Sequence, residues 1–186
     1  MRKLKLQVQI SIDGYVCGPN NEMDWMTRYI DTAGKEYVNQ LTDTSSTILL
    51  GRKMAGGFID YWTKVAADPV SPEYAFGKKM IDIPKVVFTK TLQSTDWVNT
   101  TLATGDLAEE INKLKNAEGK DILMYGGACF DASVIKTGLI DEYHLLVNPT
   151  AIGTGKAIFT GITNLELIKA TPLSSGKVAL AYKPKK

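Results

Sequence analysis

Apolar and polar side chains alternate along the first dozen residues, with the period of two that is typical of a β-strand. The apolar positions are Leu4, Leu6, Val8, Ile10 and Ile12, and the polar positions between them are Lys5, Gln7, Gln9 and Ser11. Asp13 and Gly14 follow directly, a pair that favours a turn. The pattern therefore predicts an N-terminal strand with one face packed on a core.

Short apolar runs later in the chain predict further buried strands, and segments with helical periodicity separate them. The predicted strands cover residues 47–50, 84–90, 97–104, 122–125 and 140–147. The predicted helices run from about Thr32 to Asp43, from a cap at Asp106 to a stop at Gly119, and from Ala128 to about Lys136. Strands that alternate with helices indicate an α/β fold with a mostly parallel sheet.

The end of the chain departs from this alternation. Residues 165–170 and 178–182 are two strand-like segments joined by turn residues, so they predict a C-terminal antiparallel hairpin. No internal repeat and no linker interrupts the sequence. We therefore expect a single domain over residues 1–186.

Two stretches are predicted to be connections. Residues 61–80 contain two Xaa-Pro pairs, which disfavour a continuous helix. Residues 15–21 form a loop rich in turn residues after the first strand. Val16 and Cys17 in this loop are apolar, and they either fill the core or line a pocket.

Composition narrows the class of protein. With 44% hydrophobic and 23% charged residues and a net charge of +2, the chain has the make-up of an ordinary globular protein. No apolar run reaches the roughly 20 residues that span a bilayer, and the N-terminus lacks the features of a signal peptide. Cys17, Cys129 and the single histidine, His144, do not have the spacing of a metal site. We therefore expect a cytoplasmic protein without metal, nucleic-acid or membrane partners.

The strongest candidate for chemistry is the glycine pair Gly126-Gly127, which follows an apolar strand and precedes a helix. Glycines allow a ligand to approach the backbone, and a helix N-terminus offers N–H groups that bind phosphate. Taken alone, the pair is as readily explained as a tight connection. Two other strands also end in residues suited to phosphate, in Gly51-Arg52-Lys53 and in Thr89-Lys90.

Carboxyl ends of parallel strands meet at one edge of a sheet, and this edge is where α/β proteins bind ligands. The coincidence of three such strand ends favours a phosphorylated ligand, in particular a dinucleotide. The sequence has neither the GxGxxG pattern after its first strand nor the GxxxxGK pattern of a P-loop. The usual dinucleotide fingerprint is therefore excluded.

Five segments, taken in order, resemble the dihydrofolate reductase-like superfamily. They are Ser11-Ile12-Asp13-Gly14-Tyr15-Val16, Leu49-Leu50-Gly51-Arg52-Lys53-Met54, Val86-Val87-Phe88-Thr89-Lys90, Met124-Tyr125-Gly126-Gly127-Ala128 and Ile140-Asp141-Glu142-Tyr143-His144-Leu145-Leu146-Val147-Asn148-Pro149. Within the superfamily, the chain is most similar to the branch of the RibD C-terminal domain, the reductase domain of riboflavin biosynthesis. The resemblance covers nearly the whole chain and implies a three-layer α/β/α fold with a mostly parallel central sheet and a C-terminal antiparallel hairpin.

The resemblance implies NADPH as the cofactor and a cis peptide bond between Gly126 and Gly127. The residues that match the family's cofactor site are Val16, Cys17, Gly51, Arg52, Lys53, Met54, Phe88, Thr89, Lys90, Tyr125, Gly126, Gly127, Ala128 and Cys129. Of these, Thr89 and Lys90 match the pair that selects the 2′-phosphate. Relatives of the riboflavin-pathway reductase are commonly homodimers, so a homodimer is expected.

Asp31, which follows Trp25, is the best positional match for the catalytic acid of the superfamily. Its spacing differs from the family pattern, and an ordinary helix N-cap explains it somewhat better. Glu22 is a further candidate, and Trp25 and Phe58 are candidate walls of the substrate site.

The expected function is an NADPH-dependent reductase that transfers hydride to a small pterin-like, pyrimidine-like or carbonyl substrate. It would be similar to the 5-amino-6-(5-phosphoribosylamino)uracil reductase domain. Two alternatives stay open, a non-catalytic NADPH- or pteridine-binding protein and a true dihydrofolate reductase. The second is disfavoured because only Arg28 lies near this region to hold a folate tail.

Overall fold

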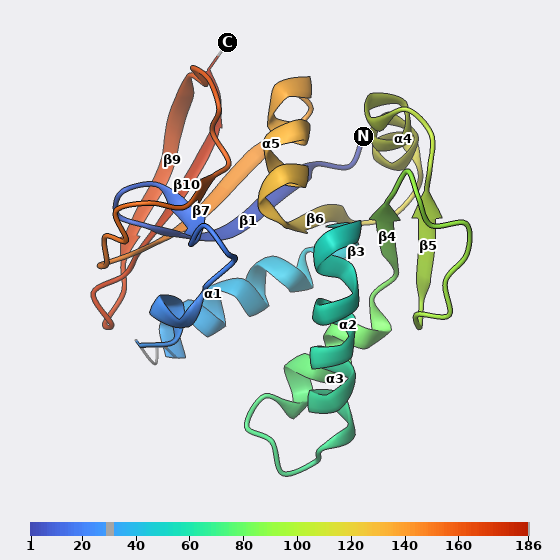
Figure 1. The fold of residues 1–186 in the computed structure, drawn as a ribbon, viewed down its shortest axis with the longest axis horizontal. Helices are drawn as coiled ribbons and strands as arrows, with labels where there is room; N and C mark the ends of the chain where they lie inside the picture. The colour runs from blue at the N-terminus through green and yellow to red at the C-terminus, as the bar shows by residue number, and fades with distance from the viewer. Residues whose placement is uncertain (29–31, 186) are drawn as a thin grey trace.

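The computed structural model describes residues 1–28 and 32–185, except for the side chains of residues 27 and 28 (Figure 1). Within these residues, eight strands form one sheet in the order β5-β4-β3-β6-β1-β7-β10-β9. The strands are β1 Leu4–Ser11, β3 Ser45–Gly51, β4 Lys85–Phe88, β5 Thr100–Ala103, β6 Asp121–Gly126, β7 Glu142–Asn148, β9 Leu165–Pro172 and β10 Val178–Pro184. Neighbouring strands from β5 to β7 are parallel, and β10 is antiparallel to both β7 and β9. The predicted fold class is thus confirmed, including the C-terminal hairpin.

Helices cover both faces of the sheet and make it the middle of three layers (Figure 1). They are the 3-10 helix η1 Asp24–Arg28 and the α-helices α1 Thr32–Asp43, α2 Arg52–Ala67, α3 Tyr74–Asp82, α4 Leu107–Asn116 and α5 Ala128–Thr137. Successive side chains of β3 point to opposite faces of the sheet. Leu49 belongs to the core under α4 and α5, whereas Ile48 and Leu50 pack with residues of α2 and α3. Figure 1 shows α4 and α5 on one side and α1, α2 and α3 on the other.

Two predictions about connections were wrong in part. Helix α2 continues to Ala67 and α3 begins at Tyr74, so most of residues 61–80 are helical. The two Xaa-Pro pairs fall in the short connection between these helices, and the apolar side chains on either side of it build a helix–helix contact. Residues 15–21 were predicted to be a loop, but Tyr15–Cys17 forms strand β2, which pairs with β8, Lys156–Ala157.

Two predicted boundaries also shift. Asp106 caps α4 as expected, because its side chain accepts hydrogen bonds from the N–H groups of Ala108 and Glu109. The helix ends at Asn116 and not at Gly119, because Glu118 and Gly119 belong to the turn into β6. The predicted fourth strand, residues 97–104, shortens to Thr100–Ala103.

The central strand β1 pairs unequally with its two neighbours. Its ladder with β7 runs from Lys5 to Ser11, but its ladder with β6 runs only from Leu4 to Leu6. Strand β6 nevertheless continues to Gly126, where it pairs with Leu50 of β3. Beyond Leu6, the carboxyl halves of β1 and β6 therefore form the two arms of a fork in the sheet.

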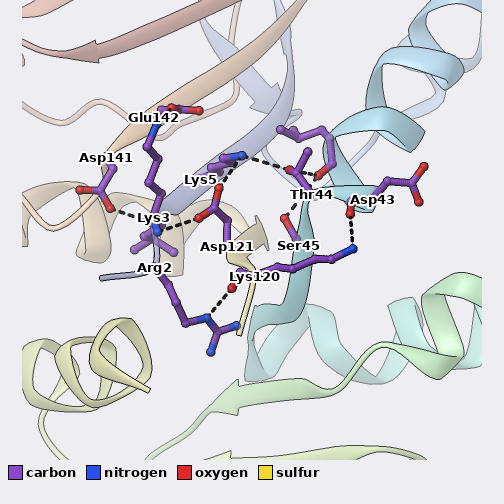
Figure 2. Close-up of polar contacts among 12 residues, drawn as sticks. Arg2, Lys3, Lys5, Asp43, Thr44, Ser45, Lys120, Asp121, Asp141 and Glu142 are labelled. Carbon is purple, nitrogen blue, oxygen red and sulfur yellow. Dashed lines mark hydrogen bonds and ion pairs between the residues drawn. The ribbon is translucent and has the colours of Figure 1, made fainter. Parts of the chain in front are cut away.

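Polar side chains connect the strands at the amino edge of the sheet, where the parallel strands begin (Figure 2). The Lys5 ammonium lies 2.8 Å from Asp121 Oδ2 and 3.0 Å from Thr44 Oγ1, and it joins β1 to β6 and to the end of α1. Asp141 accepts a hydrogen bond from the N–H of Leu4 at 2.7 Å. This edge is therefore a closed network of hydrogen bonds and ion pairs.

Arg2 is a second buried cation of this network, with 8% of its surface exposed. Its guanidinium donates to Thr47 Oγ1 at 2.6 Å and also to Ser46 Oγ and the carbonyl oxygens of Leu114 and Lys120. It thereby ties the start of β1 to β3 and to the end of α4. Buried acceptors that lose such a donor are costly.

Arg2→Ala is expected to lower the free energy of unfolding by about 2–3 kcal/mol, because it leaves these acceptors without a donor. Lys3→Ala is the matched control, since the neighbouring Lys3 side chain is 57% exposed and only pairs with Glu142. Exposed pairs of this kind contribute at most about 1 kcal/mol. Urea denaturation of both variants checks the prediction, and equal losses would contradict it.

No helix of the described residues is long and apolar enough to cross a membrane. The same residues contain no group of three or more His, Cys, Asp and Glu side chains that could hold a metal ion.

Candidate functional site

Two helices begin side by side at the carboxyl edge of the sheet. Helix α2 starts directly after β3, with Gly51 as its N-cap, and α5 starts directly after β6, with Gly127 as its N-cap. Strands β3 and β6 are neighbours. A Cβ atom on Gly51 would lie 2.6 Å from Phe130 Cβ of α5, and one on Gly127 would lie 3.6 Å from Met54 Cβ of α2. Glycine at these positions therefore allows the two helix starts to approach closely.

Neither of these helix starts has a side-chain cap. By contrast, α4 satisfies its first N–H groups with Asp106. Uncapped N–H groups and the positive end of the helix dipole form a binding site for phosphate. Arg52 and Lys53 are exposed in the first turn of α2 and add two positive charges. The geometry fits a pyrophosphate held between the two helix starts.

The peptide bond between Gly126 and Gly127 is cis, as the resemblance predicted. Gly126 has a φ of +104°, which favours glycine, and a Cβ atom there would lie 2.5 Å from Asp131 Oδ2. On the other side of the strand, the Tyr125 hydroxyl lies 3.0 Å from Thr42 Oγ1 of α1, and burial raises its pKa. Ala128 is half-buried and Cys129 is exposed at the start of α5.

The end of β4 lies farther along the same edge. Phe88 packs its ring against Phe130, with ring centres 5.0 Å apart. Thr89 is buried, and its hydroxyl accepts hydrogen bonds from the N–H groups of Thr91 and Leu92, which fixes the turn after the strand. The exposed Lys90 ammonium donates to the carbonyl oxygens of Thr104 and Gly105.

Val16 and Cys17 are buried in the core under α5. Of the two interpretations left open, core filling or pocket lining, the structure thus favours core filling. Strand β2, which carries them, pairs with β8 and lies against the end of β1. A Cβ atom on Gly155 would lie 2.3 Å from the carbonyl oxygen of Cys17, so this glycine allows the close approach.

The two candidate walls of the substrate site lie on different elements. Trp25 of η1 is 5% exposed and lines a hollow of about 290 Å³ together with residues of the loop after β7, such as Thr150 and Ile152. Phe58 of α2 packs against Trp62 and Tyr125, with ring centres 6.3 and 5.4 Å away. Trp25 therefore adjoins a hollow, whereas Phe58 belongs to an aromatic cluster.

The candidate proton donors are placed only in part. Asp31 lies outside the described residues, as does the side chain of Arg28. Glu22 is exposed, and a hydrogen bond from its own backbone, followed by those that its carboxylate accepts from Asn20, lowers its pKa. His144 is buried in β7 between the Tyr37 hydroxyl and Glu142, and burial lowers its pKa.

Three buried side-chain atoms in the described part of the chain lack a hydrogen-bond partner: Trp25 Nε1, Asp131 Oδ1 and Asn148 Oδ1. All three belong to the carboxyl edge, because Asp131 follows β6, Asn148 ends β7, and Trp25 shares its hollow with the loop after β7. Buried polar groups are nearly always paired in folded proteins. The carboxyl edge thus differs from the hydrogen-bonded amino edge and is the candidate site for a ligand.

Comparison with known proteins agrees with this geometry. Residues 2–179 match the RibD C-terminal domain family. The chain belongs to this family. YyaP of Bacillus subtilis (strain 168), an uncharacterized protein, is 33% identical over 187 aligned residues, which cover 97% of this chain and 94% of YyaP. YwjB of the same organism, also uncharacterized, is 24% identical and covers 88% of this chain.

Solved structures share the fold of this RibD C-terminal domain. A putative riboflavin biosynthesis protein from Shewanella sp. PV-4 has a TM-score of 0.75 at 21% identity, with full coverage of both chains. The diaminohydroxyphosphoribosylaminopyrimidine deaminase/5-amino-6-(5-phosphoribosylamino)uracil reductase of Thermotoga maritima has a TM-score of 0.70 at 15% identity. The chain covers 57% of that longer protein. These likenesses show the shared fold, whereas membership of the family rests on the match over residues 2–179.

No sequence pattern pointed to Asp131 or Asn148 as part of the candidate site in this RibD C-terminal domain. Asp131 reads as an ordinary acidic residue near a helix start, and Asn148 as the end of a strand. The Nδ2 group of Asn148 donates to the carbonyl oxygens of Ile10 and Leu146, whereas its Oδ1 has no hydrogen-bond partner among the described residues. Only the packing of α5 on the sheet shows that Asp131 is buried.

Proposed function

We propose that the protein is an NADPH-dependent reductase that transfers hydride to a small heterocyclic substrate, of the pyrimidine or pterin type. The observation that carries the proposal is the carboxyl edge, where two uncapped helix starts, two exposed cations and three unpartnered buried atoms coincide. Family membership supports the reductase chemistry, since the Thermotoga maritima protein is described as a uracil-derivative reductase.

The residues present suit each part of such a cofactor. Arg52 and Lys53 with the start of α2 would hold phosphate charge, and Gly126 and Gly127 let the cofactor lie against the backbone. Lys90 at the end of β4 supplies a further cation. When bound, the nicotinamide supplies the hydride. The protein's part is to position the two rings and to exclude water.

The phosphate-binding part of this proposal predicts a loss of NADPH affinity in an Arg52→Gln/Lys53→Gln variant. Loss of two cations near phosphate is expected to weaken binding about tenfold, or about 1.4 kcal/mol, at low ionic strength. The matched control is Lys64→Gln, which removes a cation from the last turn of the same helix. Calorimetric titration with NADPH at low and high salt measures both. If both variants bound NADPH with equal affinity, the phosphate groups would not lie at the start of α2.

Turnover is tested by the consumption of NADPH in the presence of pyrimidines, pterins and small carbonyl compounds. Oxidation that depends on one of these compounds is the expected result. Tight NADPH binding without oxidation of any of them would indicate a binding protein that uses the same site.

A further inference from the structure

Asp131 is the one buried carboxyl group among the described residues that has an unpartnered oxygen. It lies in the first turn of α5 and has 2% of its surface exposed. On the same helix, Val134 and Ile135 are buried in the apolar core that also contains Val8 and Ile10 of β1. An acidic residue in such a position has little access to water.

The carboxyl group lies directly against the glycine pair. The position of a Cβ atom on Gly126 would be 2.5 Å from Oδ2 and 3.0 Å from Oδ1 of Asp131. Gly126 ends the β6 arm of the fork, and Val8 and Ile10 belong to the β1 arm. Asp131 is therefore placed at the point where the fork meets the start of α5.

Among the residues that the structure describes, no charged group compensates the carboxyl. Helix α5 packs against β3, β6, β8 and α4. The titratable side chains of these elements, such as Lys156, Asp121 and Lys115, do not alter the pKa of Asp131, which burial alone raises to about 8. At neutral pH the group is thus a carboxylic acid, with one O–H donor and one C=O acceptor.

A carboxylic acid and an amide are complementary, since the acid O–H can donate to the amide C=O while the acid C=O accepts from the amide N–H. We propose that Asp131 binds the carboxamide group of the nicotinamide ring through this pair of hydrogen bonds. The inference rests on the proposed NADPH site. It gives the unpartnered oxygen an N–H donor, and it assigns the residue a role in orienting the ring. A substrate lactam edge carries the same chemistry, and the experiment separates the two.

The test compares two variants and two cofactors by their dissociation constants, measured by calorimetry without any substrate. Asp131→Leu removes both hydrogen bonds and is expected to weaken NADPH binding about tenfold. Asp131→Asn keeps one donor and one acceptor, so it is expected to bind NADPH about as well as the wild type. If Asp131→Asn bound NADPH as weakly as Asp131→Leu, the proposed pair of hydrogen bonds between a neutral acid and the carboxamide would be wrong.

The second cofactor is the reduced acetylpyridine analogue of NADPH, in which a methyl ketone replaces the carboxamide and removes its N–H donor. The wild type is expected to prefer NADPH over this analogue by about five- to tenfold, and Asp131→Leu is expected to lose the preference. This comparison within the wild type does not depend on the folding of any variant.

Each outcome is distinguishable. NADPH binding without any preference for the carboxamide in the wild type would overturn the inference and leave the proposed function intact, and would move the search to a substrate amide. Failure of the wild type to bind NADPH would overturn the proposed function and the inference together. A pH titration adds a further readout, because NADPH affinity should fall above about pH 8 in the wild type and stay level in Asp131→Asn.

Discussion

Between about pH 5 and pH 8 the ligand-free protein is expected to lose stability, and Asp131→Asn is expected to remove most of that loss. The pKa of this carboxyl is raised to about 8 in the folded protein, whereas an unfolded chain has an aspartate pKa of about 3.9. In this window the folded state binds the proton and the unfolded state does not. The free energy of unfolding therefore falls as pH rises, by at most about 1.4 kcal/mol per pH unit. The stabilising contribution is complete below pH 4 and is lost once the pH exceeds about 8.

Other groups titrate in the same window, so the difference between wild type and variant is the quantity to measure. The pKa of His144 is lowered by burial, which makes stability rise with pH as the histidine loses its proton, the opposite direction. Urea denaturation at several pH values, carried out on both proteins, cancels this contribution. Two parallel curves would show that Asp131 titrates as an ordinary aspartate.

Gly126→Ala is expected to reduce the free energy of unfolding by about 3 kcal/mol or more. The residue has a φ of +104°, which costs an alanine about 1–3 kcal/mol. In addition, the new methyl group would lie 2.5 Å from Asp131 Oδ2, so this buried side chain would have to shift in a packed surrounding. Thermal and urea denaturation measure the loss.

Gly57→Ala is the matched control for this variant. Gly57 lies within α2, and a Cβ atom there would meet nothing within 4 Å. Alanine is favoured over glycine inside a helix by about 1 kcal/mol, so this variant should be slightly more stable than the wild type. The double variant Gly126→Ala/Asp131→Ala removes the carboxyl and should recover the steric part of the loss. A Gly126→Ala protein as stable as the wild type would contradict the described strand end.

Local patterns predicted the architecture well, because their causes are local. The alternation in residues 4–12 correctly predicted strand β1, although both faces of that strand are buried and Ile12, beyond its end, is exposed. Asp106 caps α4 by accepting hydrogen bonds from its own neighbours. The error over residues 61–80 also has a local cause. The prolines mark the short connection correctly, but they do not limit the helices on either side, whose length depends on the aromatic contacts of Trp62 and Phe76.

The part of the candidate site that we propose to bind phosphate could be predicted for the same reason, since the strand ends at Gly51-Arg52 and Gly126-Gly127 are visible in the sequence. The rest depends on contacts between distant residues. The burial of Asp131 requires α5 to pack on the sheet, and the hollow beside Trp25 requires the loop after β7. No spacing in the sequence encodes either arrangement.

The unequal ladders of β1 have a mechanical consequence. The two half-sheets, β5-β4-β3-β6 and β1-β7-β10-β9, share only the short ladder from Leu4 to Leu6, reinforced by the polar network of the amino edge. The two half-sheets are thus joined only near the amino edge and can move relative to each other at the carboxyl edge. A planar molecule that forms hydrogen bonds with both arms would replace the interstrand hydrogen bonds missing between them. The rigidity of the whole sheet would then depend on whether this molecule is bound. The proposed cofactor would then stabilise the sheet in addition to taking part in the reaction.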